Sequence, residues 1–212
     1  DPSLATIDQV IAESSFDTTW SIQALLRAIF CHDDFYETGK PFGPGVKKSV
    51  KWPVDFAIGT LRLLGMRFAG AHKYIPGGSY TGIFNHMENL GQVLMDPPSV
   101  FGWDWETAWL SSSTLLARYN FARDVAAARG AARLKPDKFV DVSETDPAVI
   151  VEQVLDALDV AHNFTAEDRQ ICIDYLTDGG TVTPDLRDYR YRNAKLNGLF
   201  EIVLKSPGYQ VY

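Results

Sequence analysis

Apolar residues recur at helical spacing along most of this sequence, and that pattern limits the possible folds more than any other feature. Val54, Ile58, Leu61 and Leu64, for example, lie three or four residues apart, which places them on one face of a helix. Glycine and proline clusters separate such stripes, and residues 138–142 are the only short strand candidate. The sequence therefore predicts an all-α fold, with about seven helices in an irregular orthogonal bundle with long loops.

Capping and breaking residues predict where several of these helices begin and end. Thr165 with Asp168 matches a capping box that would open one helix. The stripe over residues 83–94 predicts a helix that is ended by the proline pair that follows it. The last helix is expected over residues 184–203, opened by a Thr-Pro pair and stopped by Ser-Pro-Gly.

Composition places the 212-residue chain among ordinary globular proteins, with 46% hydrophobic and 22% charged residues. No apolar run approaches the ~20 residues that a bilayer span needs, so no transmembrane segment is predicted. The net charge of −7 argues against a protein that binds nucleic acid through general electrostatics. We expect one helical domain over residues 1–212, and a subdomain boundary would fall in the polar link 131–145.

Neither a cofactor nor a metal ion is predicted. Phosphate-loop, dinucleotide-binding, zinc-protease and serine-hydrolase signatures are missing. The four histidines include no pair at the i, i+4 spacing that puts two metal ligands on one helix face. Cys31 and Cys172 form no CxxC pair, and the sequence leaves open whether they form a disulfide or are two buried free thiols.

An aromatic and acidic segment is the strongest candidate for a functional site. Trp103, Trp105 and Trp109 fall within seven residues, and Asp104 and Glu106 lie between them. Indole rings beside carboxylates are typical of clefts that bind sugars, and a carboxyl held against such rings can have its pKa raised enough to act as a general acid. The structural alternative is a tryptophan-rich plug at the end of a helical core.

Three stretches of the sequence are similar to motifs of one bacterial family. Residues 48–62 resemble a "K-S-P-x-E-F … G-x-L-R" helix start. Residues 91–103 resemble "G-Q-x-L-F-x-P-P-x-V-x-G-W", and residues 109–121 continue this stretch as "W-I-x-S-x-x-L-x-x-R-x-N-F". Residues 198–210 resemble a closing "L-x-x-S-P-E-Y-Q". On these motifs the chain is identified as a member of the domain-of-unknown-function family 1800.

The resemblance implies an exported bacterial protein, and it supplies no established reaction. It covers nearly the whole chain but matches the C-terminal half of typical members, so an N-terminal helical half would be missing. Because the sequence begins at Asp1 without a methionine or signal peptide, we expect a processed or excised piece of a longer protein. Asp55 and Gly208 depart from the family motifs, since glutamate is usual at both positions.

Four carboxylates and six further side chains make up the predicted site. The candidate catalytic residues are Asp104, Glu106, Asp55 and Asp96, and the candidate ligand-binding residues are Trp103, Trp105, Trp109, Gln92, Arg118 and Asn120. Buried pairing of an arginine such as Arg118 with a carboxylate is the structural alternative for that side chain.

Two hypotheses for the function remain open at this point. The first is a secreted, periplasmic or cell-envelope helical module, without catalysis, that binds a polysaccharide or another exported protein. The second is a glycan hydrolase, in which Asp104 or Glu106 is the general acid and Asp55 or Asp96 the second carboxylate. A weaker third reading is that the chain holds half of a site that the missing N-terminal region completes.

Overall fold

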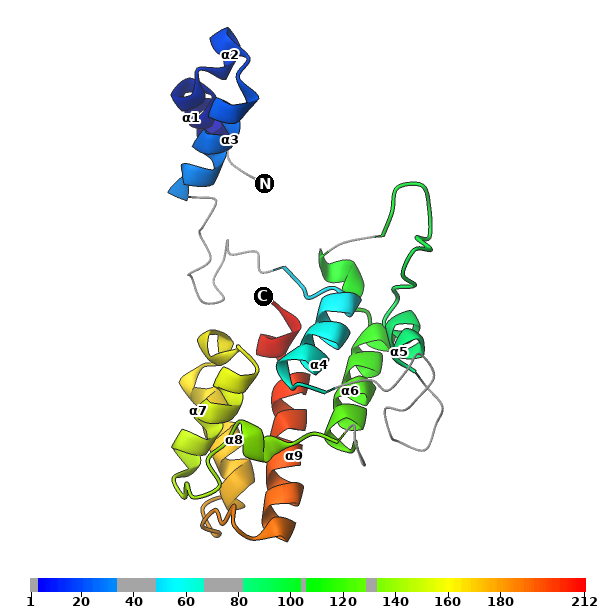
Figure 1. Ribbon diagram of the computed structural model, residues 1–212, viewed down its shortest axis with the longest axis vertical. Coiled ribbons are helices and arrows are strands. Elements are labelled where there is room, and N and C mark those ends of the chain that lie inside the picture. Colours follow the sequence, from blue (N-terminus) through cyan, green and yellow to red (C-terminus); the bar gives the residue numbers. More distant parts are fainter. Residues whose placement is uncertain (1–3, 34–48, 67–81, 104–105, 129–132) are drawn as a thin grey trace. The chain divides into compact units, whose positions relative to one another are not determined.

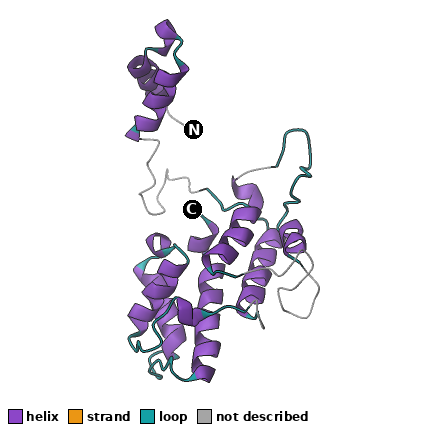
Figure 2. Cartoon of the chain, viewed as in Figure 1, coloured by secondary structure: helices purple, strands orange, loops and turns teal. Residues whose placement is uncertain are grey.

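The described part of the chain is all-α, which confirms the predicted fold class. A computed structural model describes residues 4–33, 49–66, 82–103, 106–128 and 133–212. These residues contain nine α-helices and no β-strand (Figure 2). Residues 138–142, the strand candidate, instead begin in a short 3₁₀ turn and continue as turns and loop.

The chain divides into two compact units, residues 1–47 and 48–212, which are described separately. The first unit contains α1 (Leu4–Ser14), α2 (Phe16–Thr19) and α3 (Ile22–Cys31), and α1 packs against α3. Helix α3 begins after Trp20, because Trp20 adopts a left-handed conformation and the Ser21 hydroxyl caps α3 by accepting from the Ala24 amide.

The second unit is built around α9. This central helix contacts α6, α7 and α8, while α5 packs on α6 (Figure 1). A π-helical turn, Asp55–Gly59, leads directly into α4. The helices of the unit are α4 (Thr60–Leu63), α5 (Ile83–Asn89), α6 (Ser112–Ala126), α7 (Pro147–Ala157), α8 (Ala166–Thr177) and α9 (Tyr189–Lys205).

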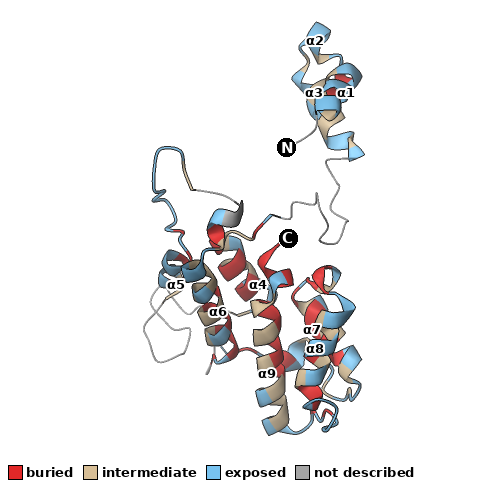
Figure 3. Cartoon of the chain, turned by 180° about the vertical axis from the view of Figure 1, so that it is seen from behind, coloured by how far each residue is buried: buried red, intermediate tan, exposed pale blue. Residues whose placement is uncertain are grey.

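Aromatic and aliphatic side chains from these helices form one apolar core. Phe56 and Phe121 are fully buried, and their ring centroids lie 5.5 Å apart. Phe200 on α9 packs edge-on against Phe139 at 6.1 Å. The buried faces of α4, α7 and α9 turn inward in Figure 3. Removal of this apolar surface from water is the main force that holds the second unit together.

The predicted capping box is confirmed, whereas two predicted helix ends are wrong. Thr165 and Asp168 form both reciprocal bonds at the start of α8. Helix α5 ends at Asn89 and does not reach residue 94, because Gly91 takes a φ of 94° that continues no helix. Helix α9 begins at Tyr189, not near 184, because the carboxylate of Asp188 caps it.

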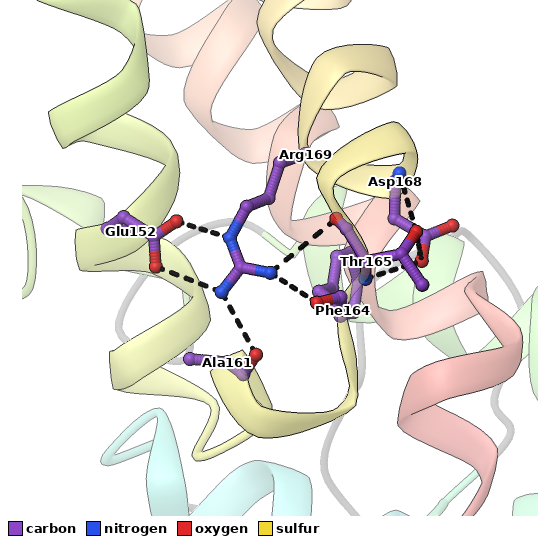
Figure 4. A network of polar contacts seen from close by, with 6 residues as sticks. All are labelled: Glu152, Ala161, Phe164, Thr165, Asp168 and Arg169. Atoms are coloured by element: carbon purple, nitrogen blue, oxygen red, sulfur yellow. Dashed lines mark hydrogen bonds and ion pairs between the residues drawn. The ribbon is translucent and has the colours of Figure 1, made fainter. Parts of the chain in front are cut away.

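Arg169 on α8 fastens the turn that follows α7. Its guanidinium bonds both carboxylate oxygens of Glu152 on α7, at 2.5 and 3.3 Å (Figure 4). The same group donates to the carbonyl oxygens of Ala161, at 3.0 Å, and of Phe164. Because these carbonyls lie in the turn over residues 159–165, one side chain holds that turn against two helices.

Three further predictions can be compared with the structure. No helix in the described parts of the chain is both long and apolar enough to cross a membrane. Cys31 at the end of α3 is exposed and Cys172 on α8 is buried, and both are free thiols. The polar link 131–145, described from residue 133 onward, lies within the second unit.

Candidate functional site

The last residues of the chain pack against the segment that leads into α4. Residues 206–212, called here the C-terminal segment, form a 3₁₀ turn that the Ser206 hydroxyl caps. The Lys51 amide donates to the Gln210 carbonyl at 2.8 Å, and the Tyr212 amide donates to the Ser49 carbonyl at 3.0 Å. In Figure 1 the red C-terminal turn accordingly lies beside the cyan segment before α4.

Arg118 on α6 forms hydrogen bonds with both of these segments. Its side chain is fully buried and donates to the Lys51 carbonyl at 2.7 Å and to Gln210 Oε1 at 3.3 Å. The guanidinium also lies over the Phe56 ring, 4.7 Å from its centroid. Among the described residues no carboxylate lies within ion-pair distance of Arg118, so hydrogen bonds and the ring take the place of a counter-ion.

Gln92 and a pair of tryptophans contact the segment that leads into α4. Gln92 is buried and its Oε1 accepts a hydrogen bond of 3.0 Å from the Val54 amide. The rings of Trp52 and Trp109 lie 5.7 Å apart, and Trp109 is only 4% exposed. The Trp103 side chain packs against the same small apolar cluster. Of the three tryptophans of the predicted site, Trp103 and Trp109 thus pack in an apolar cluster, an arrangement that favours the structural alternative for these two side chains.

A pocket of about 430 Å³ opens where the C-terminal segment, the π-helical turn and the turn after α7 meet. This volume lies within the range of small-molecule sites. Apolar side chains, such as Leu63 and Leu158, form part of its wall. We call it the Lys51 pocket, and its polar side chains are Lys51, Asp55, Asp159, His162, Asn163, Tyr209 and Tyr212.

Asp55 reaches this pocket through an irregular part of the backbone. It is the first residue of the π-helical turn, and π turns inside helices are frequent at functional sites. Burial and a hydrogen bond with Asp55 raise the pKa of the Tyr212 phenol well above its ordinary value. The Tyr212 phenol therefore stays neutral at neutral pH.

Lys51 places a partly buried ammonium group in the pocket. Its Nζ lies 3.7 Å from the centroid of the Tyr209 ring. The pKa of Lys51 is lowered from 10.5 to about 8. Burial is the main cause, the negative charge of Asp159 partly opposes it, and the positive charge of Arg118 adds a smaller decrease. A perturbed ionisable group in a pocket is a recognised sign of a functional site.

Tyr209 forms the buried side of the pocket. Only 1% of its surface is exposed, and its hydroxyl lies 2.8 Å from the Thr60 hydroxyl on α4. Burial raises the pKa of Tyr209 to about 12, and the hydrogen bond with Thr60 partly opposes this. The ring is thus a fixed neutral surface on which the Lys51 ammonium lies.

The structure brings together only part of the predicted site. Gln92, Arg118 and Trp109 converge on residues 51–54, where they support the Lys51 pocket without lining it. Of the candidate carboxylates, Asp55 lines the pocket. Asp96 is exposed in the loop after α5, and Asn120 is half-buried on α6, outside this pocket.

The remaining predicted residues lie outside what the structure describes. Asp104 and Trp105 belong to an undescribed stretch, and for Glu106 only the backbone is described, at the start of the 3₁₀ turn Glu106–Trp109. The roles assigned to these residues stay predictions.

Sequence reasoning missed most of the residues that line the pocket. Lys51 lies in the first motif, residues 48–62, and Tyr209 lies in the last, residues 198–210. Their presence in these motifs was a signal that could have marked them as site residues. No sequence signal marked Asp159 and His162, because they follow α7 in a turn that resembles any solvent-exposed connection.

A comparison with protein families matches residues 1–211 to the model of DUF1800, a protein family of unknown function. The chain belongs to the DUF1800 family. No curated protein and no solved structure matches it. For DUF1800 the structure shows that the motifs near residues 51, 92, 118 and 210 meet at one place, around the Lys51 pocket.

The glycine in the closing motif of this DUF1800 chain has a steric reason. A Cβ atom at Gly208 would lie 3.1 Å from the Asn163 carbonyl oxygen and 3.3 Å from the Phe164 ring. In return the Asn163 amide donates to the Gly208 carbonyl at 3.2 Å. The close approach of the C-terminal segment to the turn after α7 therefore favours glycine at this position.

The lowered pKa of Lys51 predicts a pH dependence of stability. Between pH 8 and 10.5 the unfolded chain holds a proton that folded Lys51 has released, so the contribution of Lys51 to the free energy of unfolding rises with pH. We expect Lys51→Met to flatten that rise when urea unfolding is measured at pH 7, 8, 9 and about 9.5.

Two features of this experiment make it specific to Lys51. The rise is clearest between pH 8 and 9, since burial raises the pKa of the Cys172 thiol from 9.0 to about 11 and that of Tyr209 to about 12, and both groups oppose the effect at higher pH because they keep their protons in the folded state. Lys138→Met removes an exposed lysine and should keep the slope of the wild type. Parallel curves for the wild type and Lys51→Met would contradict the assignment.

Proposed function

We propose that this chain is a helical recognition module, secreted or held in the cell envelope, which binds a glycan unit in the Lys51 pocket. The observation that carries the proposal is the make-up of that pocket: two carboxylates, Asp55 and Asp159, and the phenol of Tyr212 border apolar side chains. A sugar ring has apolar faces and a rim of hydroxyl groups. Carboxylates accept hydrogen bonds from such hydroxyls, and an aromatic ring packs against the apolar face.

The exposed positions of these groups support the same interpretation. Tyr212 is 52% exposed, so that its ring is accessible to a ligand. Leu63 is 42% exposed beside it. Lys51 supplies a hydrogen-bond donor to the same pocket, which His162 also lines. The location outside the cytoplasm rests on the resemblance to an exported family and belongs to the proposal.

The test is a titration of the chain with a panel of soluble polysaccharides and oligosaccharides, in which tryptophan fluorescence is the readout. Trp52 adjoins Lys51 in the sequence, and it would report occupation of the pocket. For a ligand that binds, we expect Asp55→Asn and Asp159→Asn each to weaken binding about tenfold, since each removes a hydrogen bond to a charged acceptor.

Asp137→Asn is the matched control, because Asp137 is an exposed carboxylate outside the pocket. It should leave the affinity unchanged. If no glycan of the panel binds, or if the three variants behave alike, the proposal is wrong.

A glycan hydrolase is the second candidate, and the pair of carboxylates in one pocket favours it. Glycosidases use two carboxyl groups that flank the scissile bond. Release of reducing ends, measured in the same samples, distinguishes the two functions. Release that is lost in both Asp55→Asn and Asp159→Asn supports the hydrolase, whereas binding without release supports the recognition module.

A further inference from the structure

The amine of Lys51 is accessible to a ligand. Its side chain is half-buried and borders the open space of about 430 Å³ in the Lys51 pocket. Arg118, the other basic group nearby, is fully buried and does not line this pocket. A molecule that enters the pocket therefore meets the amine of Lys51 and not the guanidinium of Arg118.

No acceptor group holds this amine. Within the described chain, no carboxylate lies within ion-pair distance of Lys51 Nζ, and no oxygen accepts a hydrogen bond from it. Other lysines are fixed by such partners, since Lys195 Nζ donates to the Tyr175 carbonyl at 2.9 Å. Lys51 Nζ instead lies over the Tyr209 ring, 3.7 Å from its centroid. The amine can thus turn to a ligand without breaking a hydrogen bond or an ion pair.

The surroundings of Lys51 favour its unprotonated, nucleophilic form. A lysine is activated as a nucleophile when it is removed from water or placed near a second cation. Burial lowers the pKa of Lys51 to about 8, Asp159 partly opposes this, and the Arg118 charge adds to it. At pH 7 about one-tenth of the Lys51 amines are unprotonated, against about 0.03% of amines with the ordinary pKa of 10.5.

We propose that Lys51 is a nucleophile which forms an imine with the aldehyde carbon of an open-chain sugar, such as the reducing end of a glycan. The ligand class in this proposal rests on the glycan binding proposed above for the same pocket. The lone pair of Nζ attacks the aldehyde carbon, a C–N bond forms, and the π electron pair of the carbonyl moves to its oxygen. That oxygen takes up two protons and leaves as water, while the nitrogen loses its two protons. Amine and aldehyde therefore give imine and water, without an oxidant or a reductant.

The charges of the pocket favour an aldehyde that is neutral and hydroxylated. Asp55 and Asp159 repel a carboxylate or a phosphate group, and no second lysine or arginine lines the pocket to attract one. The same two carboxylates accept hydrogen bonds from hydroxyl groups. An open-chain sugar therefore fits better than an oxo acid or a sugar phosphate.

The experiment traps the imine on the full chain at pH 7 with glycolaldehyde and sodium cyanoborohydride. The hydride adds to the imine carbon and leaves a stable hydroxyethyl group on the amine, which peptide mapping by mass spectrometry locates. Lys138 is exposed and serves as a reference within the same chain. We expect Lys51 to be labelled about ten times faster than Lys138, because the larger unprotonated fraction outweighs the lower basicity of its amine.

Two variants and a pH series test whether the label depends on the Lys51 amine. Lys51→Arg keeps the charge but forms no imine, so it should take up less label per chain, whereas Lys138→Met should take up nearly as much as the wild type. The labelling ratio of Lys51 to Lys138 should fall between pH 7.5 and 9.5, because Lys51 is already largely unprotonated near the upper end. The other titratable groups that line the pocket are Asp55, Asp159, His162, Tyr209 and Tyr212.

A comparison of two aldehydes tests the ligand class. D-glyceraldehyde carries hydroxyl groups and propanal carries none, so the preference for Lys51 over Lys138 should be larger with D-glyceraldehyde. Asp55→Asn should reduce this difference, because it weakens an acceptor for the hydroxyl groups. Asp137→Asn, which changes an exposed carboxylate outside the pocket, should preserve it.

Three outcomes overturn the proposal: Lys51 is labelled no faster than Lys138, their labelling ratio does not change with pH, or propanal shows the same preference as D-glyceraldehyde. The glycan titration separates this result from the proposed function. A glycan that binds while Lys51 resists labelling overturns the imine and leaves glycan binding in place. Selective labelling of Lys51 when no glycan of the panel binds confirms the imine and overturns the recognition module.

Discussion

Phe56→Ala is expected to lower the free energy of unfolding of the second unit by about 3–5 kcal/mol. Phe56 is fully buried, and its ring contacts Phe121 at 5.5 Å and Tyr209 at 5.8 Å between centroids. The Arg118 guanidinium lies over the same ring. The substitution leaves a cavity at the point where the core meets the Lys51 pocket, and it removes the surface on which Arg118 is held.

Urea unfolding, monitored by circular dichroism, measures this loss of stability. The dependence of the free energy of unfolding on urea concentration should be the same in the variant and the wild type if the same unit unfolds. Phe84→Ala is the matched control, since Phe84 on α5 is 57% exposed and its removal should cost less than about 0.5 kcal/mol. Equal losses in the two variants would mean that Phe56 does not occupy the core as described.

Arg118→Ala is expected to lower the free energy of unfolding by about 2–4 kcal/mol. The change leaves the Lys51 carbonyl and the Gln210 side-chain oxygen without their donor. It also frees the C-terminal segment from the segment before α4. We therefore expect faster hydrogen exchange at the amides of Lys51 and Tyr212, which bond across these two segments.

Two further variants show whether the loss of stability comes from the hydrogen bonds of Arg118 or from its packing. Arg123→Ala removes an arginine of the same helix whose side chain is 60% exposed, and it should change neither stability nor exchange. Arg118→Met keeps much of the volume but no donor. If Arg118→Met restores the free energy of unfolding while hydrogen exchange at Lys51 stays fast, packing of the side chain accounts for the stability and its hydrogen bonds hold the C-terminal segment in place. Protected amides in Arg118→Ala would contradict the role given to Arg118.

The all-α fold class could be predicted because it depends on local features. Apolar spacing and caps such as Thr165 act within a few residues, so they can be read directly from the chain. The predictions failed where a single backbone angle decided the outcome. Gly91 ends α5 with its positive φ, although the apolar stripe continues to Leu94, and Leu94 is 41% exposed.

The candidate site was harder to predict because tertiary packing assembles it from three distant segments, residues 51–63, 158–163 and 209–212. The tryptophans drew attention by their number, yet Trp109 is buried among apolar neighbours. Asp55 was predicted as a carboxylate of the site, and it does line the pocket. Its neighbours Asp159 and His162 come from a turn a hundred residues away, and no spacing rule connects them.

The sequence by itself determined the helical class, the caps that start α7 and α8, and the family to which the chain belongs. These properties follow from interactions between residues close in the chain or from recognisable motifs. Only the tertiary structure decided that Lys51, Asp55 and Tyr212 face one pocket. Burial lowers the pKa of both Lys51 and Arg118. It is a property of the packed chain, because it depends on which distant residues exclude water.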